Sequence, residues 1–140
     1  MTGIASGTAA LLADAILALH VGVVVFVVFG EVLFLVGGVR GWRWVRGFRL
    51  RVVHLALMGF IALQAWLGAL CPLTVWEQQL RTRAGQTAYR ESFIEHWLSR
   101  VLYYDLPWWT FVAAYTAFAV LVAITWRFVP PQRRPRSRSA

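Results

Sequence analysis

The chain has 140 residues, of which 59% are hydrophobic and only 14% are charged. A soluble domain of this size needs more charge to cover its surface, so the composition excludes an ordinary soluble protein and indicates an integral membrane protein. The formal net charge of +8 does not indicate binding to nucleic acid, because the basic residues flank hydrophobic segments instead of forming a basic face with interleaved aromatic residues.

Three hydrophobic segments are long enough to cross a bilayer. The first, about residues 9–36, exceeds the length of a hydrocarbon core of about 30 Å, so we expect it to tilt or to project. No basic residue precedes it and it is too long for a cleaved signal peptide, so it should remain as an anchor. Residues 50–70 form a second segment near the minimum length, and residues 107–129 form a third that carries tryptophans at its ends. The predicted fold class is all-α, with three transmembrane helices in a single domain, residues 1–129.

Arginine residues predict the orientation. The first connector and the C-terminal tail, residues 130–140, both carry arginines and no acidic residue, and three crossings place them on the same side. The positive-inside rule then predicts that both are cytoplasmic, that the N-terminus is outside, and that the tail is disordered against anionic lipid. The two predicted lipid-facing clusters are Arg40, Arg43, Arg46, Arg49 and Arg51 in the connector, and Arg133, Arg134, Arg136 and Arg138 in the tail.

The remaining connector, residues 71–106, should lie outside, because acidic residues offset its arginines. Thr74 to Glu77 has the form of a capping box and predicts a short helix over residues 75–83, ended by Gly85. Ser92 to Glu95 repeats this pattern before an apolar face at helical spacing. We therefore expect a second, amphipathic helix that lies in the interface and covers the bundle from outside.

Ionisable residues inside membrane spans are costly and are candidates for function. His20 and Glu31 are eleven residues apart, and His54 and Gln64 are ten apart, so each pair lies along one face of its helix. In an antiparallel hairpin the numbers of facing residues have a nearly constant sum. That rule predicts that Glu31 faces His54, that His20 faces Gln64, and that Asp14 lies level with Cys71.

These polar pairs have a structural and a chemical interpretation. Such pairs stabilise helix packing by about 0.6 kcal/mol on average and up to about 1.7, and we favour this reading. Two histidines could bind haem, but their depths differ by more than about 10 Å at 1.5 Å per residue. A haem on one histidine, a quinone pocket and a proton path through Glu31 stay open. Outside the membrane, zinc could be held by Cys71, Glu77, Glu95, His96 and Asp105, but their spacing does not enforce convergence.

The motifs Cys71-Pro72-Leu73-Thr74 and Phe93-Ile94-Glu95-His96 resemble those of a bacterial membrane family catalogued as domain of unknown function 2784. The resemblance implies an inner-membrane protein with several spans and no established activity. Its motif positions coincide with much of the polar set and imply one outward-facing group made of Asp14, His20, His54, Cys71, Glu77, Glu95 and His96. The whole candidate polar constellation is Asp14, His20, Glu31, His54, Gln64, Cys71, Glu77, Glu95 and His96.

The expected function is an accessory or structural component of the bacterial inner membrane, as a homo-oligomer or within a larger complex. No phosphate-binding loop, nucleophile elbow or zinc signature is present, so the sequence favours a protein that is not an enzyme and identifies no cofactor. The alternative is a membrane protein that binds a cofactor, a quinone or a metal through its histidine, glutamate and cysteine residues.

Overall fold

A computed structural model describes residues 2–88, 93–102 and 106–133, and this part of the chain is helical without any strand. Three of its helices are long and apolar enough to cross a membrane, over Ala5–Val39, Phe48–Trp66 and Trp108–Phe128. The predicted all-α fold with three membrane helices is confirmed. In chain order the elements are α1 (Thr2–Val39), the 3-10 turn η1 (Trp44–Arg46), α2 (Phe48–Trp66), α3 (Pro72–Arg83), α4 (Phe93–Leu102) and α5 (Trp108–Phe128).

Two helix boundaries differ from the expected ones. α2 ends at Trp66 instead of residue 70, because Gly68 takes a φ of 64° and its N–H donates to the Ala65 carbonyl at 3.2 Å. α3 begins at Pro72, which suits the first helical turn since it has no N–H to donate. Thr74 is therefore inside α3, and its predicted capping role is wrong. The predicted end of this helix is confirmed by Gly85, which has a φ of 73°.

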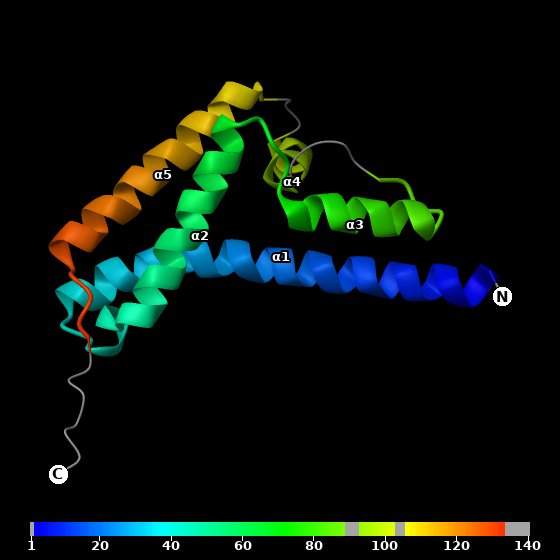
Figure 1. The fold of residues 1–140 in the computed structure, drawn as a ribbon. Coiled ribbons are helices and arrows are strands. Elements are labelled where there is room, and N and C mark those ends of the chain that lie inside the picture. Colours follow the sequence, from blue (N-terminus) through cyan, green and yellow to red (C-terminus); the bar gives the residue numbers. More distant parts are fainter. Residues whose placement is uncertain (1, 89–92, 103–105, 134–140) are drawn as a thin grey trace, which may run out of the picture.

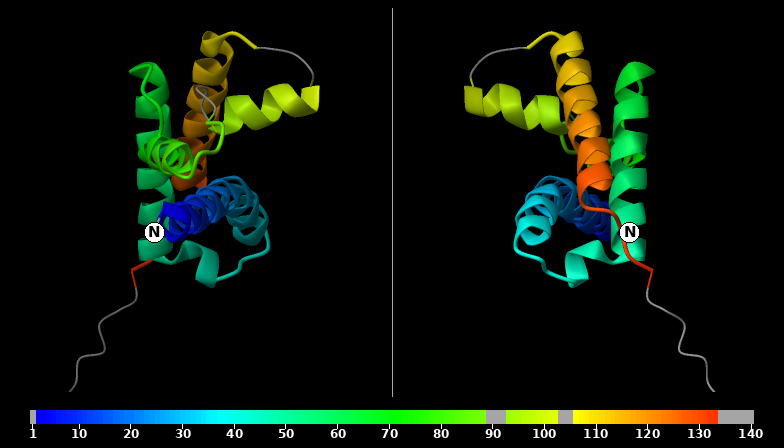
Figure 2. Two further views of the ribbon diagram at one scale, coloured as in Figure 1. Left: turned by 90° about the vertical axis from the view of Figure 1, so that its right-hand side faces the viewer. Right: turned by 90° about the vertical axis from the view of Figure 1, so that its left-hand side faces the viewer.

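The helices do not form the expected side-by-side hairpin of α1 and α2. Figures 1 and 2 show α2 packed against α5, while α1 crosses both of them near its C-terminal end. The N-terminal half of α1 lies instead along α3, on the side of the molecule away from the arginine connector. α4 corresponds to the predicted amphipathic helix, although Ser92 lies outside the described residues.

The core lies where the three long helices meet. Val27 of α1, Met58 of α2 and Val122 of α5 are buried there and are surrounded by partly buried apolar side chains. Burial of such side chains removes apolar surface from the surroundings and allows close van der Waals contact. Two indole groups add hydrogen bonds between α2 and α5: Trp66 donates to Thr116 Oγ1 at 2.9 Å, and Trp108 donates to the Ala65 carbonyl at 3.3 Å.

The segment that follows α5 is attached to the arginine connector. The Gln132 N–H donates to the Arg46 carbonyl at 2.7 Å, and Val129 is buried against Gly38 of α1. Residues 130–133 are thus placed beside the connector, although they were predicted to belong to a disordered tail. Arg134, Arg136 and Arg138 lie outside the described residues.

Gly38 provides a test of this junction. A Cβ atom added at Gly38 would collide with the buried Val129 side chain, whereas one added at Gly22 of the same helix has no neighbour within 4 Å. We expect Gly38→Ala to lower the free energy of unfolding by about 1–3 kcal/mol through overpacking. Gly22→Ala should raise it by up to about 1 kcal/mol through helix propensity. Denaturant titration in detergent measures both, and equal effects of the two variants would contradict this packing.

Candidate functional site

Four buried polar side chains from three helices meet at the crossing of α1 with α2 and α5. We call Glu31, Arg51, His54 and Thr125 the junction cluster; each is no more than 1% exposed. The Thr125 hydroxyl lies in hydrogen-bonding contact with Glu31 Oε1. His54 Nδ1 lies 4.0 Å from Glu31 Oε2, so the predicted approach of these two residues is confirmed.

His54 is held by the backbone of α1. Its Nε2 lies 2.7 Å from the Val27 carbonyl oxygen, and because a carbonyl only accepts, this nitrogen carries a hydrogen. The ring also meets Phe26 and Phe34 edge to face, with centroids 5.6 and 5.0 Å apart. Nδ1 is then the nitrogen that faces the Glu31 carboxyl group, at 4.0 Å from Oε2.

Arg51 corrects the prediction that all the connector arginines face lipid. It is 0% exposed, because α2 begins at Phe48 and places Arg51 one turn inside the helix, on the face that also carries His54. Its guanidinium donates to the Val129 carbonyl at 3.0 Å and lies 4.6 Å from the Phe34 ring centroid. It thereby satisfies a carbonyl group at the C-terminal end of α5, where a cation is also favoured by the helix dipole.

A second polar cluster joins α1 to α3. Arg81 donates to Glu77 at 2.7 Å and to Asp14 at 3.2 Å, and we call these three residues the α1–α3 ion-pair cluster. The hydrogen bond to Glu77, supported by the charge of Asp14, raises the pKa of the Arg81 guanidinium above its ordinary value. Glu77 thus binds an arginine and is not the capping residue that its spacing predicted.

The two carboxylates of this cluster should contribute unequally. The Glu77 side chain is 1% exposed and that of Asp14 is 64% exposed. We expect Glu77→Ala to lower the free energy of unfolding by about 2 kcal/mol, since it removes a buried bond to a charged group. Asp14→Ala should cost less than about 1 kcal/mol, because water screens an exposed ion pair. Denaturant titration of both variants checks this order, and a larger loss for Asp14→Ala would show that it is wrong.

A cavity of about 290 Å³ lies between the two clusters. Its wall is mostly apolar and comes from α1, α2, α5 and the start of α3. His20 and Gln64, which the hairpin rule paired, both border it, as does Cys71. Thr74 borders it too, and its buried Oγ1 has no hydrogen-bond partner in the described part of the chain. Buried hydroxyl groups normally have a partner, so this one points to a bound molecule or water.

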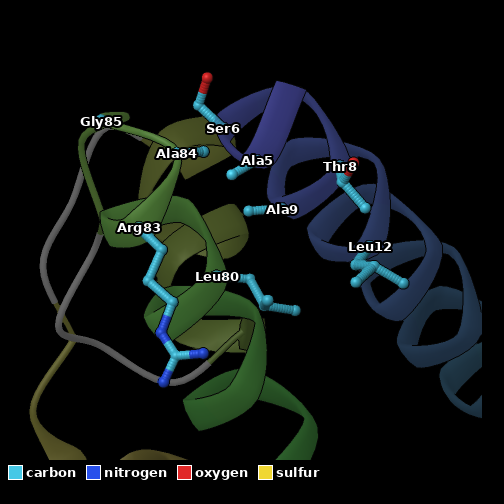
Figure 3. A pocket seen from close by; sticks show the side chains of 9 residues that line it. All are labelled: Ala5, Ser6, Thr8, Ala9, Leu12, Leu80, Arg83, Ala84 and Gly85. Atoms are coloured by element: carbon cyan, nitrogen blue, oxygen red, sulfur yellow. The ribbon is translucent and has the colours of Figure 1, made fainter. Parts of the chain in front are cut away.

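A shallow groove lies at the far end of α1, between its first turns and the end of α3. Figure 3 shows Leu80 pointing towards α1, across from Ala9, while Arg83 points away. Small residues such as Ala5 and Ala9 let the two helices approach closely here. The groove carries no buried polar group that would mark it as a binding site, so we assign it a packing role.

The structure distributes the residues of the implied outward-facing group over more than one place in the part of the chain that it describes. His54 belongs to the junction cluster, Asp14 and Glu77 belong to the α1–α3 ion-pair cluster, and Cys71 borders the cavity. His96 lies on α4 beside Trp97, and the side chain of Glu95 lies outside the described residues. Within the described ranges, no group of three or more His, Cys, Asp or Glu residues is placed to hold a metal ion.

Four of these polar residues were not singled out as members of a site in the sequence. Arg51 had a recognisable signal, since Arg51, His54 and Met58 follow helical spacing and share one buried face. Thr125 had a weaker one, three residues after Val122 on the buried face of α5. Arg81 also had one, since Glu77 lies four residues before it on the same helix, at the spacing of an ion pair. Thr74 had none as a member of a site.

The family model described as a protein of unknown function, DUF2784, matches residues 10–131, which is most of the chain. No curated protein and no solved structure matches the chain. The match includes both polar clusters and the cavity.

Proposed function

We propose that this chain, which belongs to the DUF2784 family, is a multi-pass protein of the bacterial inner membrane and has an accessory or structural role. The observation that supports it is the use of buried polar groups to join helices. Glu31 links α1 to α5, His54 links α2 to α1, and Arg51 links α2 to the end of α5. Buried polar groups that link helices in this way stabilise packing.

Purification in mild detergent tests this role. A tagged chain isolated from bacterial membranes should be colourless and free of metal, and should elute with a second copy or one partner at constant stoichiometry. A three-span membrane protein of unrelated sequence with the same tag is the control. A Soret absorbance band, bound quinone or stoichiometric zinc would contradict the accessory role and support a cofactor-binding one.

The cavity supports a second candidate, the binding of a small lipid-soluble molecule. Its wall is apolar, and the buried Thr74 hydroxyl supplies one polar group without a described partner. This combination suits a ring with a carbonyl oxygen, such as the head of a quinone, because binding sites of this kind pair an apolar wall with few polar groups. Thr74→Val should then lose a lipid-soluble molecule that Thr74→Ser retains, as measured by mass spectrometry of organic extracts. Equal retention by both variants would contradict this candidate.

A further inference from the structure

Three arginine side chains border one pocket of about 920 Å³ at the arginine end of the molecule. It lies where three segments meet: the first connector, the start of α2 and the residues after α5. The Gln132 N–H, bonded to the Arg46 carbonyl at 2.7 Å, keeps these segments together. We call this the arginine pocket and define it by Arg43, Trp44, Phe48, Arg49, Gln132 and Arg133.

The charge of the arginine pocket is uncompensated in the described part of the chain. No acidic residue borders the pocket. In the described part of the chain, the ion pairs formed by arginine all belong to Arg81, which lies outside the pocket. Arg133 lies over the Phe48 ring, with its guanidinium carbon 4.6 Å from the ring centroid. This contact holds the guanidinium plane while its N–H groups stay free to donate. Such a group binds a phosphate through two parallel hydrogen bonds.

The pocket is also lined by apolar and aromatic groups, and these favour a lipid over a soluble anion as the ligand. Trp44 is 55% exposed, and Leu50 borders the pocket beside Phe48. Tryptophan at this kind of position is typical of the boundary between headgroups and acyl chains. A ligand that satisfies both the arginines and this wall has a phosphate at one end and apolar chains at the other.

We propose that the arginine pocket binds the phosphate group of an anionic phospholipid. The proposal rests on the proposed placement of the chain in a bilayer. It assigns the binding of anionic lipid to one defined site, in contrast to a general attraction between lipid and all the arginines. Arg51, buried in the junction cluster, takes no part in it.

Native mass spectrometry with added phosphatidylglycerol tests the site. Single variants Arg43→Gln, Arg49→Gln and Arg133→Gln should each bind this lipid about tenfold more weakly, and the triple variant about a hundredfold. A triple variant Arg40→Gln, Arg46→Gln, Arg127→Gln removes the same charge outside the pocket and should change binding less than about threefold. Equal weakening by both triple variants would overturn the site in favour of general electrostatic attraction.

Two further arms identify the source of the phosphate. Inorganic phosphate in excess should displace phosphatidylglycerol only weakly, and zwitterionic phosphatidylcholine should not compete. Complete displacement by inorganic phosphate would overturn the lipid assignment. Arg49→Lys keeps the charge but loses the paired hydrogen bonds, so intermediate binding is expected even if the triple variant fails to fold. Membrane fractionation of every variant is measured alongside, so that failure of the site is distinguished from failure of the proposed membrane role.

Discussion

Glu31→Gln is expected to lower the free energy of unfolding by about 3 kcal/mol, because it removes a carboxylate from the buried cluster that holds Arg51 and leaves the buried Arg51 charge uncompensated there. The glutamine fills the same volume and still presents an oxygen to Thr125. What it removes is the carboxylate of the junction cluster, in which the Arg51 guanidinium is also buried. Unfolding in a detergent titration, followed by tryptophan fluorescence, measures this loss.

The double variant Glu31→Gln, Arg51→Met separates loss of charge compensation from loss of packing. It should recover at least about 1.5 kcal/mol relative to the sum of the single losses, since removal of both charges leaves none uncompensated. Arg49→Met removes an exposed arginine two residues away and is the matched control, with an expected change below about 0.5 kcal/mol in lipid-free detergent. Strictly additive losses in the double variant would show that Glu31 does not compensate Arg51.

His54→Ala is expected to cost about 3 kcal/mol in the free energy of unfolding, as for other large buried side chains replaced by alanine. It removes the bond to the Val27 carbonyl, leaves a space beside Gly30 and exposes the Glu31 carboxyl group to that space. His54→Gln keeps an N–H that can donate to Val27 and should lose less. The same detergent titration measures both variants.

Val53→Ala is the control for His54, because Val53 is the preceding residue of α2 and is 51% exposed. Its loss should stay below about 1 kcal/mol. Comparable losses for Val53→Ala and His54→Ala would contradict the view that α2 is held to α1 through His54.

Much of the fold could be predicted, because long apolar segments and helix-ending residues act locally. The spans matched to within a few residues except where Gly68 ends α2 early. The approach of Glu31 and His54 was also predicted, although the assumed hairpin geometry was wrong. The constant-sum rule predicts only that two residues lie at the same depth in the membrane. Glu31 and His54 can lie at the same depth where two helices cross, as well as where they run side by side.

The contacts of α3 could not be predicted from the sequence. Its capping pattern matched a surface helix, whereas in the structure Thr74 is buried and Glu77 binds Arg81. Hydropathy does not indicate which neighbour a short polar helix selects, since that choice depends on complementary charges on two distant segments. Asp14 and Arg81 are such a pair, separated by 67 positions.

Thiol labelling in intact cells tests the central claim, three crossings with the arginine connector inside, most directly. In a Cys71→Ser background, Thr87→Cys lies after α3 and Arg40→Cys lies in the first connector, and both positions are exposed. A membrane-impermeant maleimide that enters the periplasm should label Thr87→Cys in intact cells, and should label Arg40→Cys only after the inner membrane is permeabilised. Labelling of Arg40→Cys in intact cells, or equal labelling of both variants before permeabilisation, would contradict the account.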